Sequence, residues 1–139
     1  MRRLPVIQQA STDDQAAAER PRWQWCLIGA GLTATIWAPL AVIAAPFGAA
    51  PLLACYGVAA GLAGALVGRF GGRARQREAA LGAILAAFLV TSVAALGGSG
   101  LSTLGILLAM AALAAVGASF GFVGAGFGVR RRAVLDSPR

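Results

Sequence analysis

Few side chains in this sequence could take part in acid–base, nucleophilic or metal chemistry, and their spacing assembles none of these. The chain contains no histidine, lysine or asparagine, and all twelve of its basic residues are arginine. Between Trp23 and Val129, outside one basic loop, there is no Asp, Glu, Lys, Arg or His. A nucleophile needs a neighbouring base, and a metal site needs several His, Cys or carboxylate ligands. We therefore predict that the protein is not an enzyme and uses no cofactor or metal.

The remaining reactive groups are hydroxyls and two thiols. We expect the hydroxyls to donate hydrogen bonds to carbonyls one turn earlier in their own helices, as Ser and Thr commonly do. These residues are Thr33, Thr35, Thr91, Ser92 and Ser119. Cys26 and Cys55 are expected near opposite ends of two neighbouring helices, roughly 25 Å apart at the helical rise. They are therefore too distant for a disulfide within the chain and are expected to act as small apolar fillers.

The composition places these residues in a membrane protein. Of the 139 residues, 58% are hydrophobic and 12% are charged, whereas a soluble domain carries roughly 25% charged residues. A water-soluble fold of this length could not bury so much apolar surface. The formal charge of +7 does not indicate nucleic-acid binding, because the arginines flank apolar runs, where membrane insertion places them.

Four apolar runs are long enough to cross the hydrocarbon core of a bilayer. They cover residues 23–45, 52–70, 79–96 and 101–129, with the turn signals AAPFGAAP (44–51) and GGSG (97–100) after the first and third runs. The predicted fold is an all-α integral membrane protein with four transmembrane helices in an up-down antiparallel bundle. Residues 1–22 are expected to form a largely disordered cytoplasmic tail, and residues 130–139 a basic cytoplasmic tail. Pro39, inside the first run, is expected to kink that helix or to remove one hydrogen bond.

The arginines predict the orientation of the chain. Four precede the first run, four cluster at the loop between the second and third runs, and four follow the fourth run. Basic residues are retained on the cytoplasmic side of a membrane. We therefore expect a multi-pass protein of a bacterial inner membrane with both termini in the cytoplasm. An alternative is that the first run is a signal peptide cleaved near VIAAP (42–46).

The same arginines have a second candidate role, which is to contact anionic lipid headgroups on the cytoplasmic side. The residues concerned are Arg69, Arg73, Arg75, Arg77, Arg130, Arg131 and Arg132.

Glycine recurs with one spacing in the second and fourth runs. YGVAAGLAGALVG (56–68) and GASFGFVGAGFG (117–128) each include a set of four glycines in steps of 4, 3 and 4, and the two sets are 60 residues apart. At about 100° per residue, each set falls within a helical arc of roughly 60°. In lipid, such small residues let helices approach closely. The predicted helix-packing residues are Gly57, Gly61, Gly64, Gly68, Gly117, Gly121, Gly124 and Gly128.

The other two runs carry weaker lines of small residues. These are Ala30, Ala34 and Ala38 in the first run, and Gly82, Ala86, Val90 and Ala94 in the third. The repeated glycine spacing raises the hypothesis of two tandem helical hairpins. The glycine faces could pack within one chain or between protomers, and the sequence leaves both arrangements open. In either case we expect Gly61→Leu and Gly121→Leu to weaken folding or assembly.

In size and number of spans the chain resembles the small multidrug exporters, which depend on a glutamate in the first span. Run 23–45 contains no glutamate. GAGFG (124–128) resembles the glycine-rich helix of ATP synthase rotor subunits, but run 101–129 lacks their proton-carrying carboxylate. Neither resemblance therefore implies a transport activity for this chain.

Two functions are compatible with these observations. The first is a non-enzymatic scaffold, accessory subunit or assembly factor that binds membrane lipids and either itself or another membrane protein through its glycine faces. The alternative is a small oligomeric transporter, pore or holin-like protein for a neutral or apolar solute. A lipid-like solute needs no charged lining, so the absence of ionisable residues in the spans is compatible with both.

Overall fold

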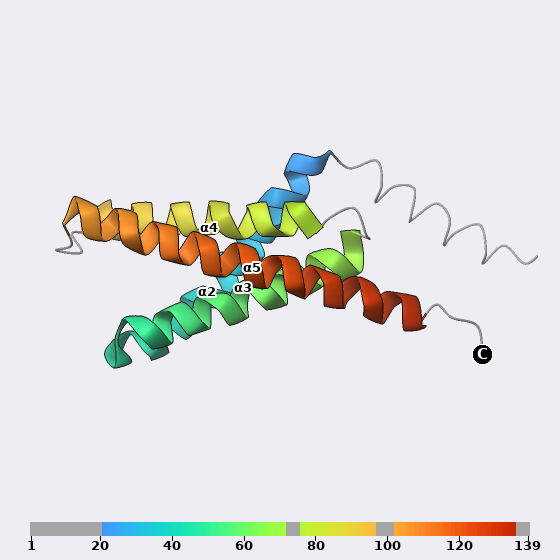
Figure 1. The fold of residues 1–139 in the computed structure, drawn as a ribbon, viewed down its shortest axis with the longest axis horizontal. Helices are drawn as coiled ribbons and strands as arrows, with labels where there is room; N and C mark the ends of the chain where they lie inside the picture. Colours follow the sequence, from blue (N-terminus) through green and yellow to red (C-terminus); the bar gives the residue numbers. More distant parts are fainter. Residues whose placement is uncertain (1–20, 72–75, 97–101, 136–139) are drawn as a thin grey trace, which may run out of the picture.

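The chain folds into four long helices that pack side by side (Figure 1). The structure, a computed structural model, describes residues 21–71, 76–96 and 102–135, without the side chains of 131–135. The helices are α2 (Arg22–Ala44), α3 (Ala49–Gly71), α4 (Gln76–Leu96) and α5 (Thr103–Leu135), and a 3₁₀ turn, η1 (Ala45–Phe47), follows α2. These described segments contain no strand. The prediction of an all-α four-helix bundle is confirmed.

Four spans in the described chain are long and apolar enough to cross a membrane: Arg22–Phe47, Ala49–Gly71, Gln76–Leu96 and Thr103–Arg130. They indicate a multi-pass membrane protein. Several predictions fall outside the described residues. These are the disordered tail at 1–20, the GGSG turn, the last residues of the C-terminal tail, and Arg73 and Arg75 of the basic loop.

The connection between α2 and α3 is tighter than the sequence suggests. Pro46 lies within η1, and Gly48 alone separates η1 from α3. Gly48 has φ +98° and ψ −170°, a backbone conformation that is essentially restricted to glycine. Pro51 does not interrupt the chain, because it lies in the first turn of α3, where a missing N–H has no intrahelical acceptor.

Helix α5 continues beyond Val129, the predicted end of the fourth run, as far as Leu135. The added segment, RRRAVL, contains neither glycine nor proline, and arginine, alanine and leucine all favour helix. Hydropathy predicts the part of a helix that lies in lipid, whereas the helix itself ends where backbone preference changes. The apolar run accordingly ends at Val129, before the three arginines, while the helix does not.

The order of helices around the bundle differs from their order in the sequence. Helix α3 packs against α2 and α5, and α4 packs against the same two helices, whereas α3 and α4 touch only across the centre. Consecutive helices run in opposite directions (Figure 1). As a result α3 and α5 are parallel neighbours, and so are α2 and α4.

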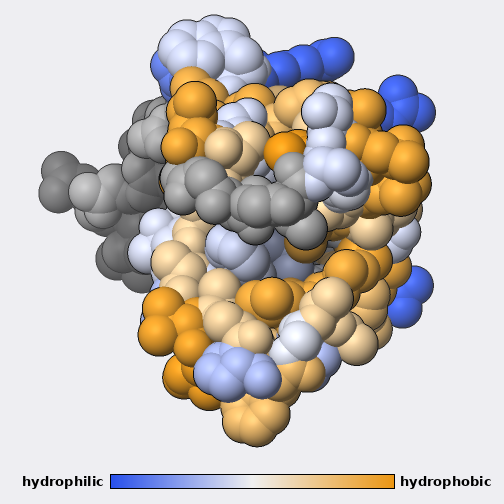
Figure 2. All heavy atoms as spheres, turned by 90° about the vertical axis from the view of Figure 1, so that its left-hand side faces the viewer, coloured by the Kyte–Doolittle hydropathy of each residue, from blue (hydrophilic) through white to orange (hydrophobic). Residues whose placement is uncertain are grey.

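The two ends of the bundle differ in charge. The end that carries Arg22, Arg69, Arg77 and Arg130 is called the basic end below. The opposite end, called the neutral end, is formed by η1, the last turn of α4 and the first turn of α5. Figure 2 looks onto the neutral end, where apolar and weakly polar residues predominate around the undescribed atoms drawn in grey.

Small residues fill the interior, and large apolar residues lie outside. The buried hydrophobic residues are mostly alanines: Ala30, Ala44, Ala59, Ala60, Ala63, Ala79, Ala83, Ala86, Ala87 and Ala125. Large side chains such as Val93 and Leu108 are exposed by 69% and 63%. In water this distribution would be unfavourable, but lipid tails are as apolar as leucine, so it suits a bundle surrounded by lipid.

The conformation of Gly48 leads to a testable prediction. Gly48→Ala should lower the free energy of unfolding by about 1–3 kcal/mol, because a side chain disfavours this backbone conformation. Gly31→Ala is the matched control, since Gly31 is helical and a Cβ there would meet nothing within 4 Å. Reversible denaturation in detergent micelles, followed by circular dichroism, measures both changes. Equal stability of the two variants would contradict the prediction.

Candidate functional site

The two glycine stripes lie against each other at the contact between α3 and α5. A Cβ placed on Gly64 would overlap the Gly121 carbonyl oxygen and lie 3.0 Å from the Gly121 Cα. A Cβ on Gly68 would overlap the Ala125 carbonyl oxygen in the same way. At these positions backbone meets backbone, and no side chain could be accommodated without moving a helix.

The glycines of α5 show the same close approach to the backbone of α3. A Cβ on Gly124 would overlap the Gly61 carbonyl oxygen, and a Cβ on Gly128 would overlap that of Ala65. These partners differ in residue number by 63, whereas Gly64 and Gly121 differ by 57. The mean of these two differences is 60, which equals the offset between the two glycine stripes in the sequence. The contacts advance together along both helices, as parallel packing requires.

Three other glycines of the stripes, Gly57, Gly61 and Gly121, lie at looser contacts. A Cβ on Gly57 would be 3.1 Å from the Val116 side chain, and a Cβ on Gly121 would be 3.3 Å from the Ala79 carbonyl oxygen of α4. A Cβ on Gly61 would make ordinary contact, at 3.7 Å, with the carbonyl oxygen of Phe120. Substitution by alanine is therefore restricted more strongly at Gly64, Gly68, Gly124 and Gly128 than at Gly61.

The contact between α2 and α4 uses small residues only near the basic end. A Cβ on Gly82 would lie 2.8 Å from the Cys26 carbonyl oxygen and 3.0 Å from the Ala30 nitrogen. Further along, the two predicted lines of small residues separate. Ala34, Ala38, Val90 and Ala94 line an open groove instead of a closed contact.

Tyr56 occupies the centre of the bundle, a position that the sequence analysis did not identify. Its side chain is fully buried, and its hydroxyl donates a hydrogen bond to the carbonyl oxygen of Ala83 on α4. Its ring meets the Trp37 ring edge-on, with centroids 5.9 Å apart and an angle of 80°. Gly117 makes room for it, because a Cβ there would lie 2.7 Å from the Tyr56 ring.

One sequence signal could have identified Tyr56. It is the only tyrosine in the chain and lies within an apolar run, where a phenol hydroxyl must find an acceptor inside the protein. The hydrogen bond to Ala83 joins α3 to α4, a diagonal pair of helices that touch only across the centre.

The other polar side chains in the spans are occupied locally. Thr33, Thr35, Thr91 and Ser119 each donate a hydrogen bond of 2.8–2.9 Å to the carbonyl four residues earlier. This confirms the predicted back-bonding for these four hydroxyls. Both cysteines are free. The described segments contain no group of three His, Cys, Asp or Glu residues that could hold a metal ion.

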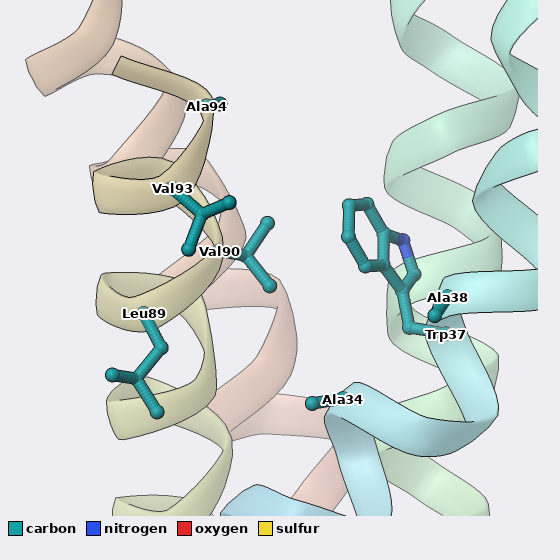
Figure 3. Close-up of a pocket in the computed structure, with 7 residues that line it drawn as sticks. All are labelled: Ala34, Trp37, Ala38, Leu89, Val90, Val93 and Ala94. Atoms are coloured by element: carbon teal, nitrogen blue, oxygen red, sulfur yellow. The ribbon is translucent and has the colours of Figure 1, made fainter. Parts of the chain in front are cut away.

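A groove of about 410 Å³, called the α2–α4 groove, opens between those helices near the neutral end. Ala34, Trp37 and Ala38 line it on α2, and Leu89, Val90, Val93 and Ala94 line it on α4. In Figure 3 the Trp37 ring extends toward Val90 across the space between the two helices. The lining contains no charged side chain.

A second groove, of about 590 Å³ and called the α3 groove, follows the outer side of α3 toward the basic end. It is lined by Leu62, Ala65, Leu66 and Arg69 of α3, Ile36 of α2, and Phe127 and Gly128 of α5. It differs from the α2–α4 groove by ending at an exposed guanidinium group.

The predicted arginine sites are described only in part. Arg69, Arg77 and Arg130 are exposed at the basic end, and Arg131 and Arg132 lie in the last turns of α5. Glu78, at the start of α4, is buried at the same end.

Comparisons of the chain with protein-family models, with curated protein sequences and with solved structures found no significant match. The geometry of the bundle therefore carries the functional argument alone.

The glycine contact predicts a difference between two substitutions on the same helix. Gly124→Ala should lower the free energy of unfolding by about 1–3 kcal/mol, because its Cβ would overlap the Gly61 backbone and force α3 and α5 apart. Gly126→Ala should be neutral or stabilising, since its Cβ would meet only the Gln76 side chain, at 3.5 Å. Denaturation in micelles compares them. A destabilising Gly126→Ala with a neutral Gly124→Ala would contradict the described register.

Proposed function

We propose that the protein is a non-enzymatic polytopic membrane protein that serves as a scaffold, accessory subunit or assembly factor. The observation that carries the proposal is the closed, small-residue interior. Backbones touch along α3 and α5, Tyr56 fills the centre, and the hydroxyls of Thr33, Thr91 and Ser119 bond to their own helices. Such an interior offers rigidity and no reactive group.

The proposal places partner binding on the outer surface of the bundle. The two glycine stripes contact each other within one chain, so their role is to hold the helices in register. Exposed apolar side chains such as Leu81, Phe88 and Leu89 remain for contact with another copy of the chain or another membrane protein. Large apolar patches of this kind are characteristic of surfaces that meet lipid or a partner.

The proposed location is a bacterial inner membrane, with the basic end and both termini on the cytoplasmic side. The positive-inside rule supports this orientation, because every arginine of the sequence lies before or at the start of α2, at or near the loop between α3 and α4, or in the last turns of α5 and beyond. Anionic lipid headgroups on that side are the proposed lipid partners, since each arginine near a charged surface contributes about 1 kcal/mol to membrane attraction.

Native mass spectrometry of the complex, extracted gently from its own membrane, tests the proposal. We expect a second protein to accompany the chain in fixed stoichiometry. The same extraction with Leu81→Asn, Phe88→Asn and Leu89→Asn, three exposed positions of α4, should show whether this face holds that partner. Isolation of the chain alone, at every detergent concentration tested, would count against the accessory role.

A second candidate function is an oligomeric transporter, pore or holin-like protein for a neutral or apolar solute. The α2–α4 groove favours it, because an uncharged lining of alanine, valine, leucine and tryptophan suits an apolar solute. Pure protein in liposomes would then release an entrapped neutral dye, and Ala34→Trp should reduce the release by filling the groove. Liposomes that stay tight with the wild-type chain would exclude this alternative.

A further inference from the structure

We propose that the α3 groove binds one anionic phospholipid from the leaflet at the basic end, with an acyl chain along the groove and the phosphate at Arg69. This inference rests on the proposed membrane location, and it adds a defined site to the general attraction between arginines and lipid. A phospholipid is the proposed ligand because the groove places the Arg69 guanidinium at one end of an apolar channel, at a fixed depth in the membrane.

The length of the groove matches the acyl region of one leaflet. Leu62, Leu66 and Arg69 lie on one side of α3 and line the groove together. From Leu62 to Arg69 the helix rises about 10 Å, at about 1.5 Å per residue. Half of a hydrocarbon core is about 15 Å thick. With Arg69 at the polar boundary, the groove therefore reaches well toward the middle of the bilayer.

Two neighbouring helices supply the walls at the two ends of the groove. A Cβ on Gly29 of α2 would lie 3.8 Å from Val67 of α3. Because these helices are antiparallel, Ile36, seven residues further along α2, lies near the level of Leu62 and closes the inner end. Phe127 of α5 is 62% exposed and forms a wall nearer the basic end. An acyl chain would cover apolar surface on all three helices.

The charge at the mouth of the groove complements a phosphodiester. Arg69 is exposed there, and Gly128 of α5 lies against its backbone, since a Cβ on Gly128 would be 2.9 Å from the Arg69 nitrogen. Arg130, two residues further along α5, is also exposed at this end. Glu78 is the only acidic residue among the described segments, and it lies on α4, away from the groove lining.

The volume of the groove also fits a lipid chain. At about 590 Å³ it falls within the range of roughly 300–1,000 Å³ that is typical of ligand pockets. A guanidinium group can donate two parallel hydrogen bonds to a phosphate. Selectivity for anionic over zwitterionic phospholipid is the expected consequence, because the mouth of the groove presents arginines and no described carboxylate.

Titration of the purified full chain in detergent with phosphatidylglycerol, followed by native mass spectrometry, tests the site. We expect one tightly bound phosphatidylglycerol and weaker binding of phosphatidylcholine. Arg69→Gln should weaken the first binding step about fivefold. Arg77→Gln removes an exposed arginine on α4 at the same end, outside the groove; it lowers the diffuse attraction but should weaken the first binding step less than Arg69→Gln does. Equal losses for both variants would overturn the proposal in favour of diffuse attraction.

A second pair of variants tests the apolar part of the groove without changing charge. Leu62 and Leu107 are exposed by 53% and 52%, but only Leu62 lines the groove. Leu62→Trp should fill the groove and reduce occupancy at least threefold, whereas Leu107→Trp should have no effect. Circular dichroism checks that each variant is folded. Lipid binding that survives Leu62→Trp, or that inorganic phosphate displaces at equal concentration, would overturn the acyl-chain assignment.

These measurements are independent of the search for a partner protein. The purified chain can bind phospholipid whether or not a second protein accompanies it in the membrane. Loss of the lipid result would leave the accessory role standing, and absence of a partner protein would leave the lipid site standing.

Discussion

Direct backbone contact between α3 and α5 is the constraint on which the rest of the bundle depends. In water, two such helices would be joined by burial of leucine and isoleucine, but lipid already provides an apolar environment for those side chains. What remains is close van der Waals approach, and it is greatest where no Cβ intervenes. The overlap that a Cβ would produce at Gly64, Gly68, Gly124 and Gly128 shows how close that approach is.

This contact sets the relation between the two hairpins. Because α3 and α5 are parallel and in register at an offset of 60 residues, the hairpin α2–α3 lies beside the hairpin α4–α5 with equivalent helices as neighbours. The pair α2 and α4 then meets through Gly82 near the basic end. Tyr56 bridges the diagonal pair α3 and α4. Its hydroxyl donates a hydrogen bond to the Ala83 carbonyl, and the absence of a side chain at Gly117 leaves room for its ring.

Two buried clusters follow one another along the bundle. Toward the basic end, Trp25, Val67, Ala79 and Ala125 pack together beside the close glycine contacts. Toward the neutral end, Tyr56 packs with Trp37 and Leu113. The tips of the two hairpins diverge there (Figure 1), and the α2–α4 groove opens between them. The proposed contacts with lipid and with a partner lie on the outer grooves and the exposed apolar faces of this bundle.

The sequence by itself determined the membrane class, the number of helices, the absence of Asp, Glu, Lys, Arg and His from the middle of the spans, and the local bonding of hydroxyls such as Thr33 and Ser119. These properties depend on composition and on neighbours within one helix. Only the tertiary structure decided that the glycine stripes face each other within one chain, that α3 and α4 are diagonal, and that Tyr56 is central. It also decided where the grooves lie. The reason is that a lipid-exposed face and a helix-packed face are equally apolar, so hydropathy carries no information on which helix a given face will meet. Which helix a face packs against depends on how well the two helix surfaces fit together, and that fit is defined only in the folded bundle, where the backbones approach each other.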